Sequence, residues 1–107
     1  MMYKQISHIE AKQLIRERDI VIVDVRDEDS YEEERITNAI HLSMAALQEY
    51  SNKADKEKAI LVYCYHGVSS QSVAKRLAAQ DFKEVYSLIG GFEIWKSYHH
   101  SISDKNK

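Results

Sequence analysis

The chemistry of this chain centres on its single cysteine, Cys64. An apolar run of strand type, residues 59–63, precedes it, and a short polar loop follows it and leads into an amphipathic segment. A thiolate is a strong nucleophile when its negative charge is stabilised, and free backbone N–H groups at the start of a helix supply that stabilisation. The same position also suits an inert cysteine in a hydrophobic core. The residues alone leave both interpretations open.

The loop after Cys64 contains residues suited to surrounding an anion, namely Tyr65, His66, Gly67, Val68, Ser69 and Ser70. Gly67 gives the backbone freedom to curl so that successive N–H groups point toward the sulfur. Ser69 and Ser70 can donate hydroxyl hydrogen bonds, and we expect one of them to cap the following helix. His66 either lowers the pKa of the Cys64 thiol when it is protonated or orients the loop, and the sequence favours neither role.

Two charged residues, Asp24 and Arg26, follow another buried run and are candidates for a supporting role. The carboxyl ends of parallel strands meet at one edge of a sheet, where ligands bind, so we expect both residues at the same edge as Cys64. Polar residues at a strand end more often pair with each other and with loop backbone than touch substrate. We therefore expect Asp24 and Arg26 to fix the walls of the site.

The acidic residues and the remaining histidines do not predict a metal site. The acids at 27–29 and 32–34 are explained by helix capping and by the helix dipole, which favours negative charge in the first turn. The remaining histidines lack the spaced cysteine, histidine or acidic partners of a ligand set; they are His8, His41, His99 and His100. We expect no metal ligands in this chain.

Strand and helix signals alternate along the chain. Strands are expected at 20–23, 39–42, 59–63 and 84–88, and helices at about 8–15, 30–34, 44–50, 70–80 and 92–98. Two capping boxes, Ser7 with Glu10 and Ser30 with Glu33, are expected to open the first two helices. This alternation predicts an α/β domain with a mainly parallel sheet of about five strands and helices on both faces. The domain is expected to span residues 1–100, followed by a polar tail at 101–107.

The composition excludes several classes of protein. At 107 residues the chain suits one domain, and its net charge of −2 offers no broad basic field for nucleic acid. No apolar run approaches the roughly 20 residues of a membrane helix, and the N-terminus lacks the apolar core of a secretory signal. One unpaired cysteine suits a reducing compartment. These features predict a cytoplasmic protein without nucleic-acid or membrane partners.

The loop Cys64-Tyr65-His66-Gly67-Val68-Ser69-Ser70 resembles the active-site loop of the rhodanese family. The resemblance runs from Ser7 to Tyr98. It includes Val23-Asp24-Val25-Arg26, the Tyr31 helix with Ile36 and Ala39 behind it, and Leu88-Ile89-Gly90-Gly91-Phe92 with Trp95, in the family's order and spacing. The chain departs from the family pattern in three ways: it has Glu34-Arg35 where many relatives have Gly-His, Val68 where a polar residue is usual, and no arginine or lysine in the loop.

The resemblance implies a single rhodanese-like domain and a transfer of sulfur in two steps. The Cys64 thiolate would attack the outer sulfur of thiosulfate, release sulfite and hold a persulfide. Cyanide, or a thiol or dithiol protein such as thioredoxin, would then remove that sulfur. The N–H groups of Tyr65 through Ser69 would stabilise the anionic sulfur, as an oxyanion hole stabilises oxygen. No metal or organic cofactor is implied.

Two other functions compete with sulfur transfer from thiosulfate. A cysteine phosphatase or arsenate reductase needs a longer cradle that ends in arginine, whereas the first arginine after Cys64 is Arg76, well inside the next expected helix. A rhodanese-like module would instead dock partners without turnover, or would relay persulfide sulfur between proteins. Inactive modules commonly lack the cysteine, and this chain retains it.

Overall fold

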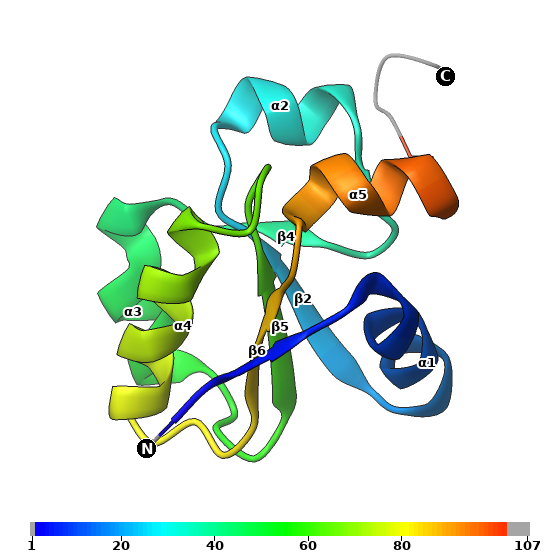
Figure 1. Cartoon of the computed structure of the whole chain (residues 1–107). Helices are drawn as coiled ribbons and strands as arrows, with labels where there is room; N and C mark the ends of the chain where they lie inside the picture. Colours follow the sequence, from blue (N-terminus) through cyan, green and yellow to red (C-terminus); the bar gives the residue numbers. More distant parts are fainter. Residues whose placement is uncertain (1, 103–107) are drawn as a thin grey trace.

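A five-stranded parallel sheet forms the centre of the protein (Figure 1), in a computed structural model that describes residues 2–102. Its strands lie in the order β1-β6-β5-β2-β4, and every neighbouring pair is parallel. Their bounds are Lys4–Ile6 (β1), Ile20–Asp24 (β2), Ile40–His41 (β4), Ala59–Tyr63 (β5) and Val85–Leu88 (β6). The predicted α/β architecture is confirmed.

Helices cover both faces of this sheet. Their bounds are His8–Glu17 (α1), Glu28–Glu33 (α2), Leu47–Lys53 (α3), Ser69–Ala79 (α4) and Gly91–Tyr98 (α5), with a 3₁₀ turn at Met44–Ala46 before α3. Figure 1 shows α3 and α4 on one side of the sheet and α1 on the other. Two separate buried clusters, one with residues of α3 and α4 and one with residues of α1 and α5, show the same division.

The central strands β5 and β2, apart from Asp24 at the end of β2, consist of hydrophobic residues because both of their faces are covered. Val23 and Val62 are register partners and pack into the α3–α4 cluster, whereas Ile22 and Leu61 pack into the α1–α5 cluster. Successive strand residues point to opposite faces, so an uninterrupted apolar run is needed to fill both cores. The same register aligns Asp24 with Tyr63, the residue before Cys64. Asp24 and Cys64 therefore lie at the same edge of the sheet, as predicted.

Of the two capping boxes predicted at the starts of the first two helices, one is present and the other is absent. The Ser7–Glu10 capping box is present at α1. The box predicted at Ser30 is wrong, because α2 begins one turn earlier and is capped by Asp27. The Asp27 carboxylate accepts from the Ser30 N–H at 3.0 Å and from its hydroxyl at 2.7 Å, which lowers the pKa of Asp27. A carboxylate accepts two such bonds better than a serine hydroxyl can, so the earlier residue takes the cap.

The predicted tail begins too early. Ser101 and Ile102 form a short strand, β7 (Ser101–Ile102), which pairs antiparallel with β3 (Arg35–Ile36). The ordered domain therefore passes residue 100, and residues 103–107 lie outside the described residues. Within residues 2–102, no helix is long and apolar enough to span a bilayer.

Candidate active site

Cys64 lies directly after β5, and its sulfur sits in a ring of hydrogen-bond donors. The Gly67 N–H donates to Cys64 Sγ at 3.1 Å and the Ser70 N–H at 3.3 Å, and Ser70 Oγ lies 3.4 Å from the sulfur. Cys64 is buried, with 6% of its surface exposed. The loop therefore curls around the sulfur, as we predicted from Gly67 and the two serines. Backbone N–H groups and one hydroxyl surround Sγ.

The turn that begins α5 holds the loop in this shape. The Phe92 N–H donates to the Cys64 carbonyl at 2.8 Å, and the Glu93 N–H donates to the Tyr65 carbonyl at 3.0 Å. Two carbonyls of the loop are therefore engaged on the side of α5. Gly67 has φ +85°, and a Cβ atom there would lie 2.7 Å from the Gly90 nitrogen, so this approach requires glycine.

Neither serine caps α4, contrary to the prediction. The residue at the cap position is Val68, whose side chain cannot accept a hydrogen bond, and Ser69 is exposed. The Ser70 N–H, one of the unpaired donors of the first turn, points to the sulfur instead. Cys64 Sγ therefore takes the place that a capping oxygen would fill.

These contacts change the acidity of the thiol. Burial alone would raise the pKa of Cys64, but hydrogen bonds from the Ser70 hydroxyl and N–H and from the N–H groups of Gly67 and Val68 outweigh it. The pKa of Cys64 is therefore lowered. All of these donors are neutral, so the anion is stabilised by dipoles rather than by a cation.

His66 faces away from the sulfur ring and toward α5. Its Nδ1 lies 3.1 Å from Glu93 Oε1, and its side chain is 63% exposed. The ring also meets the Tyr65 ring edge to face, with centroids 4.6 Å apart. Of the two roles that the sequence left open, these contacts favour orientation of the loop.

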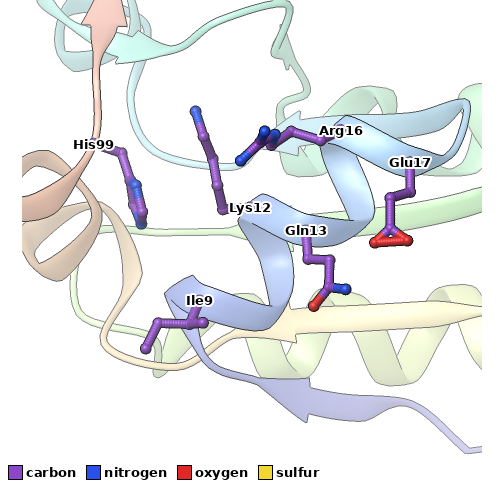
Figure 2. A pocket seen from close by; sticks show the side chains of 6 residues that line it. All are labelled: Ile9, Lys12, Gln13, Arg16, Glu17 and His99. Atoms are coloured by element: carbon purple, nitrogen blue, oxygen red, sulfur yellow. The ribbon is translucent and has the colours of Figure 1, made fainter.

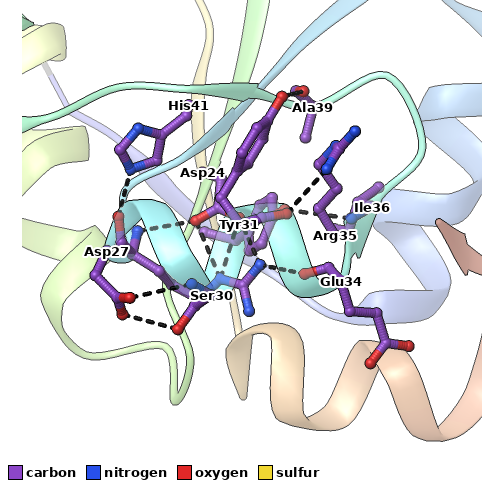
Figure 3. Close-up of polar contacts among 11 residues, drawn as sticks. Asp24, Asp27, Ser30, Tyr31, Glu34, Arg35, Ile36, Ala39 and His41 are labelled. Carbon is purple, nitrogen blue, oxygen red and sulfur yellow. Dashed lines mark hydrogen bonds and ion pairs between the residues drawn. The ribbon is translucent and has the colours of Figure 1, made fainter. Parts of the chain in front are cut away.

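Asp24 and Arg26 form a buried ion pair beside the loop, and Figure 3 labels Asp24 and Glu34, the two residues whose oxygens accept from Arg26. Arg26 Nη2 lies 2.6 Å from Asp24 Oδ2 and also donates to the Glu34 carbonyl at 2.6 Å. The guanidinium stacks 4.4 Å from the centroid of the Phe92 ring. Burial opposes the charge of Arg26, but the carboxylate of Asp24 outweighs it, so the pKa of Arg26 is raised. The pair joins β2 to α5 and to the end of α2, so the two residues pair with each other and with backbone as expected, and their part in forming the walls of the site stays a prediction.

The sequence reasoning missed two residues near the site. Ser87 of β6 lies beside Val62 in the parallel register, and its hydroxyl reaches Ser70 Oγ at 2.9 Å. Lys96 of α5 lines a groove of about 270 Å³ together with Arg26, Tyr65 and Phe92, among others. Its amine lies 5.4 Å from the centroid of the Tyr65 ring. A serine within a buried strand was the only signal that could have pointed to Ser87.

A larger hollow lies elsewhere. Figure 2 shows an open groove of about 550 Å³ beside α1, lined by Ile9, Lys12, Gln13, Arg16, Glu17 and His99. None of the predicted site residues lines this groove, so it lies apart from the Cys64 thiol. Residues 2–102 also hold no cluster of three metal-ligating side chains. His8 and His99 instead contact each other through ring nitrogens 2.9 Å apart.

The fold and the cysteine loop agree with comparisons to known proteins. The family description "Rhodanese-like domain" matches residues 7–98. This chain belongs to the rhodanese family.

Named relatives lie within that family. Thiosulfate sulfurtransferase GlpE of Coxiella burnetii (strain RSA 331 / Henzerling II) is 75% identical over 107 residues, which cover 100% of this chain and 99% of the relative. Thiosulfate sulfurtransferase GlpE of Pseudomonas syringae pv. syringae is 43% identical over 88 residues, 82% of this chain and 83% of the relative. The crystal structure of a rhodanese-like domain protein from Staphylococcus aureus superimposes with a TM-score of 0.77 at 28% identity, covering 86% of this chain and 90% of that one.

Proposed function

We propose that this protein is a thiosulfate sulfurtransferase with Cys64 as its nucleophile. The observation that carries the proposal is the buried sulfur of Cys64, which receives hydrogen bonds from the N–H groups of Gly67 and Ser70. Such a ring favours an anion on sulfur, and both the attacking thiolate and a terminal persulfide are anionic. The identity to GlpE proteins of two genera supports thiosulfate as the donor.

In the first step, the Cys64 thiolate attacks the outer sulfur of thiosulfate. A new S–S bond forms on Sγ while the S–S bond of thiosulfate breaks, and the electron pair of that bond leaves with sulfite. The product is a Cys64 persulfide, and no external oxidant or reductant is consumed. The loop donors Gly67, Val68 and Ser70 would stabilise negative charge on the sulfur throughout this step.

In the second step, an acceptor attacks the outer sulfur of the persulfide and regenerates the Cys64 thiolate. Cyanide becomes thiocyanate. The first thiol of a dithiol protein such as thioredoxin would take the outer sulfur and become a persulfide. Its second thiol would then attack the inner sulfur of that persulfide, release hydrogen sulfide and leave a disulfide in the acceptor. We assign this reaction to the cytoplasm, because a single unpaired cysteine suits a reducing compartment where such dithiols are available.

The structure gives little support to phosphate chemistry at this site. A phosphatase cradle needs an arginine whose two N–H groups hold the phosphate oxygens. The guanidinium of Arg26 is instead paired with Asp24 and the Glu34 carbonyl. Arg76 lies in the body of α4, away from the first turn that faces the sulfur.

The test is the formation of thiocyanate from thiosulfate and cyanide by wild type, Cys64→Ser and a matched control, Ser97→Ala. Ser97 is an exposed serine of α5 whose hydroxyl donates to the Glu93 carbonyl of the same helix. We expect turnover by wild type and Ser97→Ala and none by Cys64→Ser. Turnover by Cys64→Ser would contradict the proposal. Negligible turnover by wild type would favour a docking or persulfide-relay module, and hydrolysis of an aryl phosphate that needs Cys64 would favour a phosphatase.

A further inference from the structure

A chain of buried hydroxyl groups connects the sulfur to the neighbouring strand. Cys64 Sγ lies 3.4 Å from Ser70 Oγ, and Ser70 Oγ lies 2.9 Å from Ser87 Oγ. Ser70 is fully buried and Ser87 is 1% exposed. Ser87 does not touch the sulfur, so any influence that it has on Cys64 passes through Ser70.

The number of available hydrogens determines the direction of this chain. Each hydroxyl carries one hydrogen. Within residues 2–102, the only hydrogen-bond partner of the Ser87 hydroxyl is Ser70 Oγ, and the only acceptor for a Cys64 S–H is the same atom. Two links therefore connect three groups, and each link needs one hydrogen.

The thiol and the thiolate fill these two links differently. In the thiol, the groups carry three hydrogens for two links, so one donor is left without an acceptor. That donor is the Ser87 O–H, the Ser70 O–H or the Cys64 S–H, depending on how the hydroxyls turn, and burial makes an unmatched donor costly. In the thiolate, two hydrogens fill two links, with Ser87 donating to Ser70 and Ser70 donating to the sulfur. Only the ionised form satisfies the whole chain.

We propose that Ser87 is a positioning residue: by donating its hydroxyl hydrogen to Ser70 Oγ, it turns the Ser70 hydroxyl toward the sulfur and favours the anionic form of Cys64. The hydrogen bond from Ser70 to the sulfur already lowers the pKa of Cys64. The proposal adds that the direction of this bond is set from β6. Its value for turnover rests on the proposed sulfurtransferase activity, but the ionisation itself can be measured without any sulfur transfer.

The test measures the pH dependence of the alkylation rate by iodoacetamide, which reports the thiolate of the single cysteine. We expect Ser87→Ala to raise the midpoint of this pH profile by about half a pH unit. Below the midpoint, such a shift makes the thiolate fraction roughly threefold smaller. Ser51→Ala is the matched control, because Ser51 is a fully buried serine of α3 whose hydroxyl has no partner among the described residues. Its midpoint should equal that of wild type.

A double-mutant cycle separates positioning from a general structural effect. We expect Ser70→Ala to raise the midpoint more than Ser87→Ala does, and Ser87→Ala to add no shift in the Ser70→Ala background. An unchanged midpoint in a folded Ser87→Ala variant would overturn the proposal. So would an equal shift with and without the Ser70 hydroxyl. Far-UV circular dichroism and the midpoint of urea unfolding show whether a variant has lost its fold. If Ser87→Ala does not fold, the test uses Ser87→Thr, which keeps the hydroxyl. Ser87→Thr must then show the wild-type pH profile of alkylation, and a shifted profile would overturn the proposal.

The same variants distinguish this proposal from the proposed function. If wild type transfers no sulfur but Ser87→Ala still shifts the alkylation profile through Ser70, the sulfurtransferase assignment fails and the positioning role stands. If wild type turns over thiosulfate and the profile does not respond to Ser87→Ala, the positioning role fails alone.

Discussion

The neighbouring strands β2 and β5 end side by side, and each places a group that can carry negative charge at the same edge of the sheet. The two groups are stabilised differently. The carboxylate of Asp24 has a full positive charge against it, with Arg26 Nη2 at 2.6 Å. The sulfur of Cys64 has the N–H groups of Gly67 and Ser70 and the Ser70 hydroxyl, all of them neutral.

The difference follows from what each charge has to do. The Asp24–Arg26 ion pair supports the architecture, because it connects the sheet to α2 and α5 through the Glu34 carbonyl and the Phe92 ring. In the proposed cycle, the charge on Cys64 moves from Sγ to the outer sulfur of the persulfide and returns to Sγ. Neutral dipoles can stabilise the anion at both positions.

The largest effect should come from breaking the buried ion pair between Asp24 and Arg26. Asp24→Ala leaves the buried guanidinium of Arg26 without its carboxylate, and we expect a loss of about 3–5 kcal/mol in the free energy of unfolding. Glu49→Ala is the control, since it breaks an exposed ion pair with Lys53 whose side chains are 75% and 76% exposed, and should cost less than about 0.5 kcal/mol. Urea unfolding measures the free energy of unfolding of both variants. An equal loss in Asp24→Ala and Glu49→Ala would show that the buried pair does not stabilise the fold.

A smaller effect should follow from a change to the cradle backbone. Gly67→Ala places a side chain at φ +85°, where strain alone costs about 1–2 kcal/mol, and the Gly90 nitrogen is 2.7 Å from the new Cβ. We expect a loss of stability and a higher alkylation midpoint, because the Gly67 N–H moves from the sulfur. Asn38→Ala is the control at φ +71° in an exposed turn. If Gly67→Ala loses no more free energy of unfolding than Asn38→Ala and leaves the alkylation midpoint unchanged, the close approach of Gly67 to Gly90 does not hold the donors around the sulfur.

The smallest effect is a dependence of stability on pH. Because the pKa of Cys64 is lowered in the folded protein, the unfolded chain binds more protons between the folded and unfolded pKa values. The free energy of unfolding of wild type, relative to Cys64→Ser, should therefore rise with pH through this window and stay high above the ordinary thiol pKa of about 8.5. Urea unfolding of both proteins across this range measures the difference, which would be flat if the cradle did not favour the anion.

The sequence predicted those parts of the molecule that depend on local pattern. The uninterrupted apolar runs before Asp24 and Cys64 identified β2 and β5, and their parallel pairing predicted that both residues share one edge. The Ser7–Glu10 box is local as well, and it is present. Each of these features is encoded within a few residues or within a general rule of parallel sheets.

The remaining features depend on contacts between distant segments. No local pattern shows that Ser87 reaches Ser70, because that contact needs the register of β5 and β6. The pairing of Ser101 and Ile102 with β3 is likewise set by where α5 ends. The absent serine cap of α4 also depends on a contact outside the helix. The sulfur of Cys64 accepts the hydrogen bond from the Ser70 N–H that a capping oxygen would otherwise accept, so the local capping pattern does not apply here.

The most direct test of the central claim is the intact mass of the reduced protein after incubation with thiosulfate. We expect wild type to gain the mass of one sulfur atom, cyanide or a dithiol to remove it, and Cys64→Ser to gain nothing. No gain by wild type, or a gain that Cys64→Ser retains, would contradict the assignment of Cys64 as the residue that carries sulfur.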